Sequence, residues 1–382
     1  MYGLLGFLQD AVILGRPVQS EPGIIVGPIA WLFGTILSFM FDFAYWITPN
    51  NSLGFAIIML TVVAMTMLLP LNVKAQKSMI KMQKLNPEIE KIKAKYGGKN
   101  DAETKQKISQ ETQALWAKHK VNPLGSCLPM LIQMPLFFGL LYIMNQSFQY
   151  ITVLTALYDD VSSAIIAVPG YIDIMAPLAL PYIPDAWQVN GNTLMSIFNG
   201  LIAGGMHPDV AMQTALNTLG TTDVIVLGLP EHMSRVLDRF SQEDWNTLLG
   251  QIGQTQPAYL PRVQAYFDRM QSIEFFFGLS LKENSGWRLP GIIIPILAVL
   301  TTMATSWFSQ QVNKAKDQQA KTMQTVMMTV MPLFMGFITV SFPAGVGLYW
   351  ITSNLYRLVQ QIVMNKQAGV PFRLPFLKKE EA

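Results

Sequence analysis

Five runs of this sequence are nearly free of charge and long enough to cross a lipid bilayer. They cover residues 53–71, 126–150, 287–308, 323–342 and 344–364. A transmembrane helix needs about 20 mostly apolar residues, and its backbone satisfies its own hydrogen bonds inside the hydrocarbon layer. The whole chain is only 13% charged, against roughly 25% in a typical soluble domain. The pattern predicts an all-α polytopic membrane protein with a five-helix transmembrane core.

Lysine and arginine are distributed unevenly among the segments between these runs. Residues 72–125 carry twelve lysines and five acidic residues, and the loop 309–322 and the tail 365–382 are also net positive. Residues 151–286 carry thirteen acidic and five basic residues. Because positively charged loops stay in the cytosol, we expect the N-terminal segment 1–52 and the module 151–286 outside, and the C-terminus inside.

Residues 24–46 allow two interpretations. They are apolar, but Pro28 and Asp42 interrupt them, and Trp31, Tyr45 and Trp46 suit a membrane interface. We favour an amphipathic helix lying along the outer surface. The alternative is a sixth span, which moves the amino terminus to the inside and leaves the rest of the topology unchanged.

The basic segment 72–125 predicts a cytosolic helical hairpin. Apolar residues recur every three or four positions from Met79 to Tyr96, as on one face of a helix. Asn86-Pro87 predicts a cap and a restart, Gly97-Gly98 a break, and Asn100 or Asp101 the cap of a second helix ending near Lys120. Such a surface suits RNA phosphates or anionic lipids, although a loop that only sets topology is the simpler alternative.

The sequence offers little for covalent chemistry. Its single cysteine, Cys127, excludes a disulfide framework, and its three histidines show no nucleophile–base or metal-ligand spacing. We therefore expect no enzyme, no metal and no cofactor. A transporter or channel remains the alternative, although the internal repeats or buried ion-coupling charges typical of many transporters are not evident.

Two motif blocks identify a family resemblance. NPLGSCLPMLIQMP (122–135) and FPAGVGLYWITSN (342–354), with the basic hairpin and GPIAWLF upstream, resemble the YidC/Oxa membrane protein insertase family. The resemblance covers some 200 residues. It implies a multi-pass protein of the bacterial cell membrane that inserts nascent membrane proteins through a hydrophilic groove, alone or with the Sec translocon.

The resemblance also implies where the groove lies. Family members commonly carry an arginine in the first span, but Met65 occupies that position here. Arg357 in the last span stands at nearly the same depth, so we expect it to supply the missing charge; snorkelling to cytosolic headgroups is the alternative. The expected groove residues are Met65, Gln133, Thr305, Trp350, Asn354, Arg357 and Gln361. The uncharged polar residues also fit helix–helix hydrogen bonds.

The expected partners are nascent membrane proteins, the ribosome, the Sec translocon and anionic lipids. The family's cytosolic parts help receive ribosomes or targeting factors, which implies contacts by Lys77, Lys81, Lys84, Lys91, Lys93, Lys95, Lys378 and Lys379. Compared with the family's usual length, residues 160–270 are expected to form an extra, mainly helical external insertion. Helices are expected to start at Pro230 and after Ser241, and a third covers YLPRVQAYFDRMQSIEFFF. The partner of this module is unknown.

Overall fold

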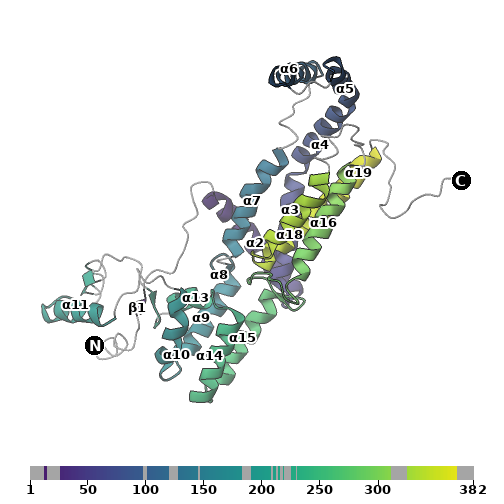
Figure 1. Ribbon diagram of the computed structural model, residues 1–382. Coiled ribbons are helices and arrows are strands. Elements are labelled where there is room, and N and C mark those ends of the chain that lie inside the picture. The colour runs from purple at the N-terminus through teal and green to yellow at the C-terminus, as the bar shows by residue number, and fades with distance from the viewer. Residues whose placement is uncertain are drawn as a thin grey trace. The chain divides into compact units, whose positions relative to one another are not determined.

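The computed structural model describes most of the chain. The described residues are 13–14, 26–97, 101–119, 128–144, 147–182, 191–207, 210–211, 214–215, 218, 225–228, 230–310 and 325–367. They divide into two compact units (Figure 1). The first unit contains residues Met1–Leu53 and Tyr142–Glu283, and the second contains Gly54–Leu141 and Asn284–Ala382.

The described elements are almost all helical. In the first unit they are β1 (Ile13–Leu14), α2 (Val26–Ile47), α8 (Ser147–Tyr150), α9 (Thr152–Ile166), α10 (Tyr171–Ala179), a 3-10 turn (Leu180–Tyr182), α11 (Gly191–Ala203), β2 (Ile225–Val226), α13 (Pro230–Leu237), α14 (Gln242–Thr255), α15 (Leu260–Glu274), β3 (Phe275–Phe276) and β4 (Leu279–Ser280). Those assigned mainly to the second are α3 (Ser52–Met67), α4 (Leu69–Lys84), α5 (Asn86–Lys95), α6 (Ala102–Lys118), α7 (Leu128–Met144), α16 (Ile293–Gln310), a π-helical turn (Val326–Val330), α18 (Met331–Thr339) and α19 (Ala344–Gln367).

The first unit is a helical bundle in which α9 packs on α13 and α15, and α14 packs on α10 and α15. Its core is apolar and includes Leu154, Val236, Leu248 and Ile273. The expected helix starts at Pro230 and after Ser241 are confirmed. Ser241 and Asp244 form a reciprocal capping box that satisfies backbone N–H groups at the start of α14.

The predicted third helix of this unit ends earlier than its sequence suggested. Helix α15 stops at Glu274, and the following phenylalanines form a short hairpin, β3 paired antiparallel with β4. Phe277 and Gly278 at its tip both have positive φ, 49° and 82°. A two-residue hairpin turn requires this backbone, which a glycine adopts without strain. β1 and β2 form a second two-stranded antiparallel sheet.

The second unit contains three closely packed helices, α16, α18 and α19 (Figure 1). Small residues allow α16 to approach both neighbours. A Cβ at Gly336 of α18 would overlap the Val299 side chain, and one at Gly347 of α19 would overlap Ile294. Because lipid tails give little hydrophobic driving force between helices, close packing of this kind stabilises helix pairs in membranes.

The first predicted span is bent in the structure. Helix α3 ends at Met67, and the axes of Ser52–Met67 and Leu69–Ser78 differ by 55°. Pro70 stands at the bend, and proline lacks the N–H that a continuous helix needs. The other four predicted spans overlap α7, α16, the π-helical turn with α18, and α19, with end differences of up to six residues. Their positions in a membrane stay a prediction.

Length and composition single out helix α2. Among the described residues, Gly27–Ile47 is the one continuous helix long and apolar enough to cross a membrane, and the bent α3–α4 pair makes a second if it is one span. Gln133–Met144, Ile293–Ser309 and Met328–Thr339 are shorter apolar helices. The interfacial position expected for α2 therefore stays a prediction.

Helices α5 and α6 follow α4 along the chain and pack against each other (Figure 1). The cytosolic hairpin expected for this segment stays a prediction. Asp101 caps α6 as expected, accepting hydrogen bonds from the Thr104 N–H at 3.0 Å and hydroxyl at 2.9 Å. Gly97 has φ of 60° just after α5 ends. The expected Asn86 cap is wrong, because Asn86 is already the first residue of α5 and no side chain caps this end.

Candidate functional site

The candidate site is a polar cluster on helix α19 of the second unit. Trp350, Asn354, Arg357 and Gln361 share one face of this helix, as their spacing predicted. Pro343 directly precedes the first residue of α19. Proline is tolerated there because a backbone N–H at the start of a helix would have no partner within the helix. Trp350 and Arg357 contact α7, whereas Asn354 contacts α16 and Gln361 contacts α4.

Arg357 is the one charged member of this cluster. Its guanidinium donates a hydrogen bond to Oε1 of Gln133 on α7, and Nε2 of Gln133 donates to the Tyr349 hydroxyl. No carboxylate among the described residues pairs with Arg357. A guanidinium has five N–H donors, so this cation is held by uncharged groups and keeps capacity for an anionic partner.

Aromatic residues of α7, α19 and the turn before α19 form a cluster on the side of the Gln133–Arg357 pair that the predicted topology places outward. The ring of Phe137 meets Phe342 and Trp350 edge to face, with centroids 5.3 and 5.7 Å apart. Phe137 follows Gln133 by one helical turn on α7, and Trp350 precedes Arg357 by seven residues on α19. The aromatic rings on the two helices therefore lie one to two helical turns from the Gln133–Arg357 pair.

Asn354 joins α19 to α16. It is 4% exposed, and its amide donates to the hydroxyl of Thr302 at 2.8 Å and of Thr301 at 3.3 Å. Thr305 donates to the Asn354 carbonyl at 3.2 Å. These bonds confirm helix–helix hydrogen bonding for the threonines. Buried polar groups need such partners, so Asn354 positions the helix that carries Arg357.

Gln361 is also buried and joins α19 to α4. It accepts a hydrogen bond from Gln76 and donates to Asn365 at 2.8 Å, and Asn365 donates to the Phe308 carbonyl at 3.1 Å. Sequence reasoning missed Gln76 and Tyr349 as neighbours of this site. Both follow from the register between helices, which spacing within one helix does not determine.

Met65 is 1% exposed on α3. The next residue, Thr66, shares a 3.1 Å hydrogen bond with the Tyr356 hydroxyl, so α3 lies beside α19 one residue from Arg357. The structure thus places α3, α7 and α19 around the same level of the second unit. Met65 contributes apolar packing where the family resemblance led us to look for an arginine.

The basic hairpin presents part of its predicted contact set to solvent. Lys77, Lys81, Lys91 and Lys95 are exposed, and Lys93 is half-buried. Lys95 forms an ion pair with Glu111 of α6 at 2.7 Å, and the Tyr96 hydroxyl donates to the same carboxylate at 2.6 Å. The side chain of Lys84 and the whole of Lys378 and Lys379 lie outside the described residues.

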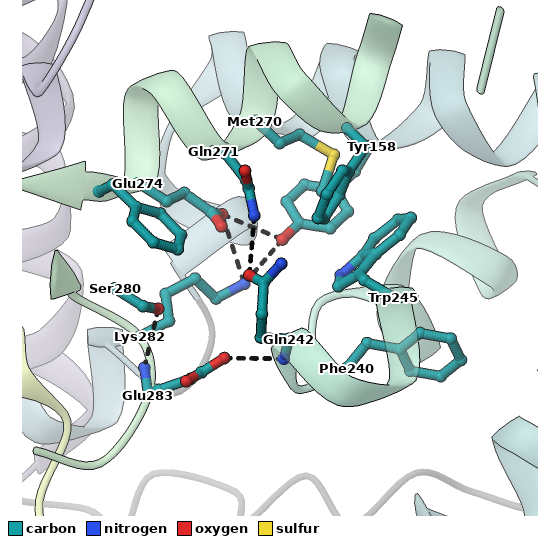
Figure 2. A pocket seen from close by; sticks show the side chains of 12 residues that line it. Tyr158, Phe240, Gln242, Trp245, Met270, Gln271, Glu274, Ser280, Lys282 and Glu283 are labelled. Atoms are coloured by element: carbon teal, nitrogen blue, oxygen red, sulfur yellow. Dashed lines mark hydrogen bonds and ion pairs between the residues drawn. The ribbon is translucent and has the colours of Figure 1, made fainter. Parts of the chain in front are cut away.

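The first unit contains a second polar cluster, which the sequence did not suggest. The Lys282 ammonium pairs with Asp238, lies 3.5 Å from Glu274, and donates to the Tyr158 hydroxyl at 2.8 Å. Figure 2 shows Tyr158, Glu274 and Lys282 converging, with Gln242 beside them. Tyr158, Asp238 and Glu274 are all less than 10% exposed.

Burial and the charges of neighbouring groups shift the pKa values in this cluster. It raises the pKa of Glu274 and of Asp238, although Lys282 acts in the opposite direction. Burial alone would lower the pKa of Lys282, but the two carboxylates outweigh it and hold the pKa well above the ordinary lysine value. Four segments of the unit meet here, so the cluster has a structural role in joining α9, α13, α15 and the chain after β4.

Comparison with known proteins identifies the family. A family model described as "60Kd inner membrane protein" matches residues 44–198 and 258–370, which is well over half of the chain. The chain belongs to this YidC/Oxa family. The match includes Gln133, Met65 and Arg357 and leaves out residues 199–257, which lie inside the predicted external insertion of 160–270.

Curated relatives in the YidC/Oxa family bear the name "Membrane protein insertase YidC". That of Anaeromyxobacter sp. (strain Fw109-5) is 45% identical over 128 residues, 33% of this chain and 22% of the relative. That of Clostridium tetani (strain Massachusetts / E88) is 44% identical over 97 residues, 25% and 42% of the two chains. That of Oceanobacillus iheyensis (strain DSM 14371 / CIP 107618 / JCM 11309 / KCTC 3954 / HTE831) is 42% identical over 114 residues, which are 30% of this chain and 41% of the relative. The aligned part of this chain spans less than half the length of these relatives.

Proposed function

We propose that this protein is a membrane protein insertase of the bacterial cell membrane. Its relatives carry that name, and the observation that supports it most directly is Arg357, a cation held by Gln133 with no carboxylate partner among the described residues. In this proposal Arg357 attracts the acidic segment of a client that has to cross the bilayer. The process is non-covalent and uses no cofactor.

The energetic task of an insertase is to lower the cost of moving polar groups through hydrocarbon. A charged residue at the centre of a span costs at least about 2.5–3.5 kcal/mol on insertion scales. A groove containing water and a fixed cation lowers this cost, because a passing carboxylate exchanges some of its hydration for a charge-assisted hydrogen bond. Gln133, Tyr349 and Arg357 supply such donors between α7 and α19.

The proposed groove includes all seven residues expected from the sequence, in different roles. Arg357 and Gln133 contact the client, and Trp350 with its aromatic partners closes the outward side. Asn354, Thr305 and Gln361 position α19 through their hydrogen bonds, and Met65 supplies an apolar wall. The helices involved are α3, α7, α16 and α19.

The proposed topology has five spans, with the N-terminus outside and the C-terminus inside. It places the basic hairpin 72–125 in the cytosol, where its exposed lysines suit the phosphates of a ribosome or anionic lipid headgroups. Nascent membrane proteins are the proposed clients, and the Sec translocon is a proposed partner. The first unit then faces outward with α2 at the outer interface.

Reconstitution tests this function. We expect liposomes containing the purified chain to integrate a short single-span client with an acidic outer segment, and empty liposomes to integrate far less. Arg357→Ala is expected to reduce integration several-fold, and Arg357→Lys to retain much of it because the charge remains. Arg262→Ala, at an exposed position of α15, is the matched control. Solute flux without client integration indicates a transporter or channel and rejects the proposal.

A further inference from the structure

An open groove in the second unit is lined by none of the seven residues of the proposed client groove. It runs between α3 and α4 on one side and α19 on the other, and its volume is about 530 Å³. Val62, Leu355, Val359 and Val363 line it and are 42–63% exposed. The groove is therefore an apolar surface that a second molecule can cover.

The groove is long. Its lining on α19 extends from Thr352 to Gln367, a length of about 22 Å at 1.5 Å per residue. The apolar side chains along this length suit an extended hydrocarbon chain, which buries its own apolar surface against them.

The length also matches a lipid leaflet. A bilayer with its headgroups is about 40–45 Å thick, so one leaflet is about 20–22 Å. In the proposed topology Gln367 marks the cytosolic end of α19, and the groove then extends from the cytosolic headgroups to near the bilayer centre. Tyr356, within the groove, is tied to Thr66 of α3 by a hydrogen bond that holds the two walls together.

Positive charge is concentrated at the cytosolic end of the groove. Lys74 follows the lining residue Val73, Lys366 precedes the lining residue Gln367, and both lysines are exposed. Helices α4 and α19 contain no acidic residue, and neither lysine forms an ion pair with a described residue. Basic residues near the surface of an anionic membrane are attracted to its headgroups.

We propose that this groove binds an anionic phospholipid of the cytosolic leaflet. One acyl chain lies along Val62, Val359 and Val363, and the phosphate lies near Lys74 and Lys366. The inference rests on the proposed orientation of the insertase but not on client insertion itself. The bound lipid covers the apolar faces of α4 and α19 and stabilises the base of the hairpin where it leaves the membrane.

Photolabelling of the full chain in nanodiscs tests this site. The probes are phosphatidylglycerol and phosphatidylcholine that carry a photoreactive diazirine on one acyl chain, and labelled residues are mapped by mass spectrometry. We expect phosphatidylglycerol to label α3, α4 and α19 several-fold more than phosphatidylcholine. Lys74→Gln with Lys366→Gln is expected to remove this preference, and Val359→Trp to remove labelling by both probes.

Leu300→Trp provides the matched control, because Leu300 is exposed on α16 and does not line the groove. It is expected to leave groove labelling unchanged. Equal labelling of the groove by both lipids, or labelling no stronger than at exposed α16 positions, overturns the proposal. Exclusion of both lipids by a bound client segment also overturns it and makes the groove a client site. Because labelling is measured without insertion, it can succeed even where the reconstitution test fails.

Discussion

At the scale of single residues, the polarity of the site depends on which atoms surround Arg357. Gln133 offers an amide oxygen, so it orients the guanidinium without neutralising it. An amide and a carboxylate have nearly the same shape but differ by one charge. That difference allows the electrostatic part of the mechanism to be tested at almost constant volume.

Gln133→Glu is therefore expected to inactivate the site through a new ion pair with Arg357. Integration of a client with an acidic outer segment should fall several-fold, because the cation is then already paired, whereas a client with an uncharged outer segment should be much less affected. Gln133→Ala, which removes the contact without adding charge, is the control. Unchanged integration of the acidic client by the Glu variant would argue against an electrostatic role for Arg357.

Lys282 gives a second residue-level prediction, this time for stability. Lys282→Met leaves Asp238 and Glu274 buried without their cation, and removing one partner of a buried ion pair costs about 3–5 kcal/mol. Hydrogen exchange of the full chain in detergent should show easier opening of α9, α13 and α15 at neutral pH. Arg262→Met, at an exposed position of the same unit, should have little effect.

The pH dependence of this variant has a definite sign. Burial raises the pKa of both carboxyl groups above their unfolded values of about 4. At pH values between the unfolded pKa and the raised folded pKa, the folded state therefore binds more protons than the unfolded state. The free energy of unfolding therefore rises as the pH falls through this window. After correction for intrinsic exchange rates, the difference in free energy of unfolding between the wild type and Lys282→Met should become smaller in mild acid. A deficit that grows there contradicts the assignment.

At the scale of secondary-structure elements, close contact between α16 and α19 positions the site. Gly347→Ala introduces a methyl group against Ile294, and overpacking of this kind costs about 1–3 kcal/mol. We expect a lower melting temperature in detergent and weaker client integration. Gly250→Ala in α14, where a Cβ meets nothing within 4 Å, should be neutral or slightly stabilising. Equal melting temperatures for the two variants would disprove the packing argument.

The accuracy of sequence reasoning also differs by element. Helix starts that depend on local chemistry were predicted correctly at Asp101, Pro230 and Ser241, since a cap is formed by residues within one turn. Asn86 failed because α4 and α5 are separated by only Leu85, which leaves no extended residue to act as a cap. The bend after Met67 was missed because the hydropathy of a segment carries no information about the direction of its helix axis.

Contacts between different helices could not be predicted from the sequence, because spacing within one helix does not determine its register against another. The spacing predicted that Arg357 and Gln361 share one face of α19. It did not predict that Gln133 contacts Arg357 or that Gln76 contacts Gln361. The residues of the Lys282 cluster are spread from position 158 to position 282. Contacts between residues so far apart produce no recognisable pattern in any short stretch of the sequence. The family resemblance indicated where to expect a groove, and the structure shows the hydrogen-bond partners of Arg357 and Gln361.

At the scale of the whole molecule, the proposed topology predicts which residues each aqueous side reaches. In a Cys127→Ser background, Lys91→Cys should react with an impermeant maleimide only from the cytosolic side, and Arg262→Cys only from the outside. Val26→Cys and Thr48→Cys, at the two ends of α2, should both react from outside if α2 is interfacial. Labelling of Val26→Cys from the cytosol instead makes α2 a sixth span.

In the proposed mechanism, a client's polar segment passes beside Arg357 during insertion. Photo-crosslinking from position 133 to a ribosome-bound client of increasing length in native membranes tests this step. We expect crosslinks from position 133 as the client's acidic segment reaches the bilayer, and few from the exposed position 300 on α16. Equal crosslinking from both positions, or none from position 133 at any client length, would contradict it.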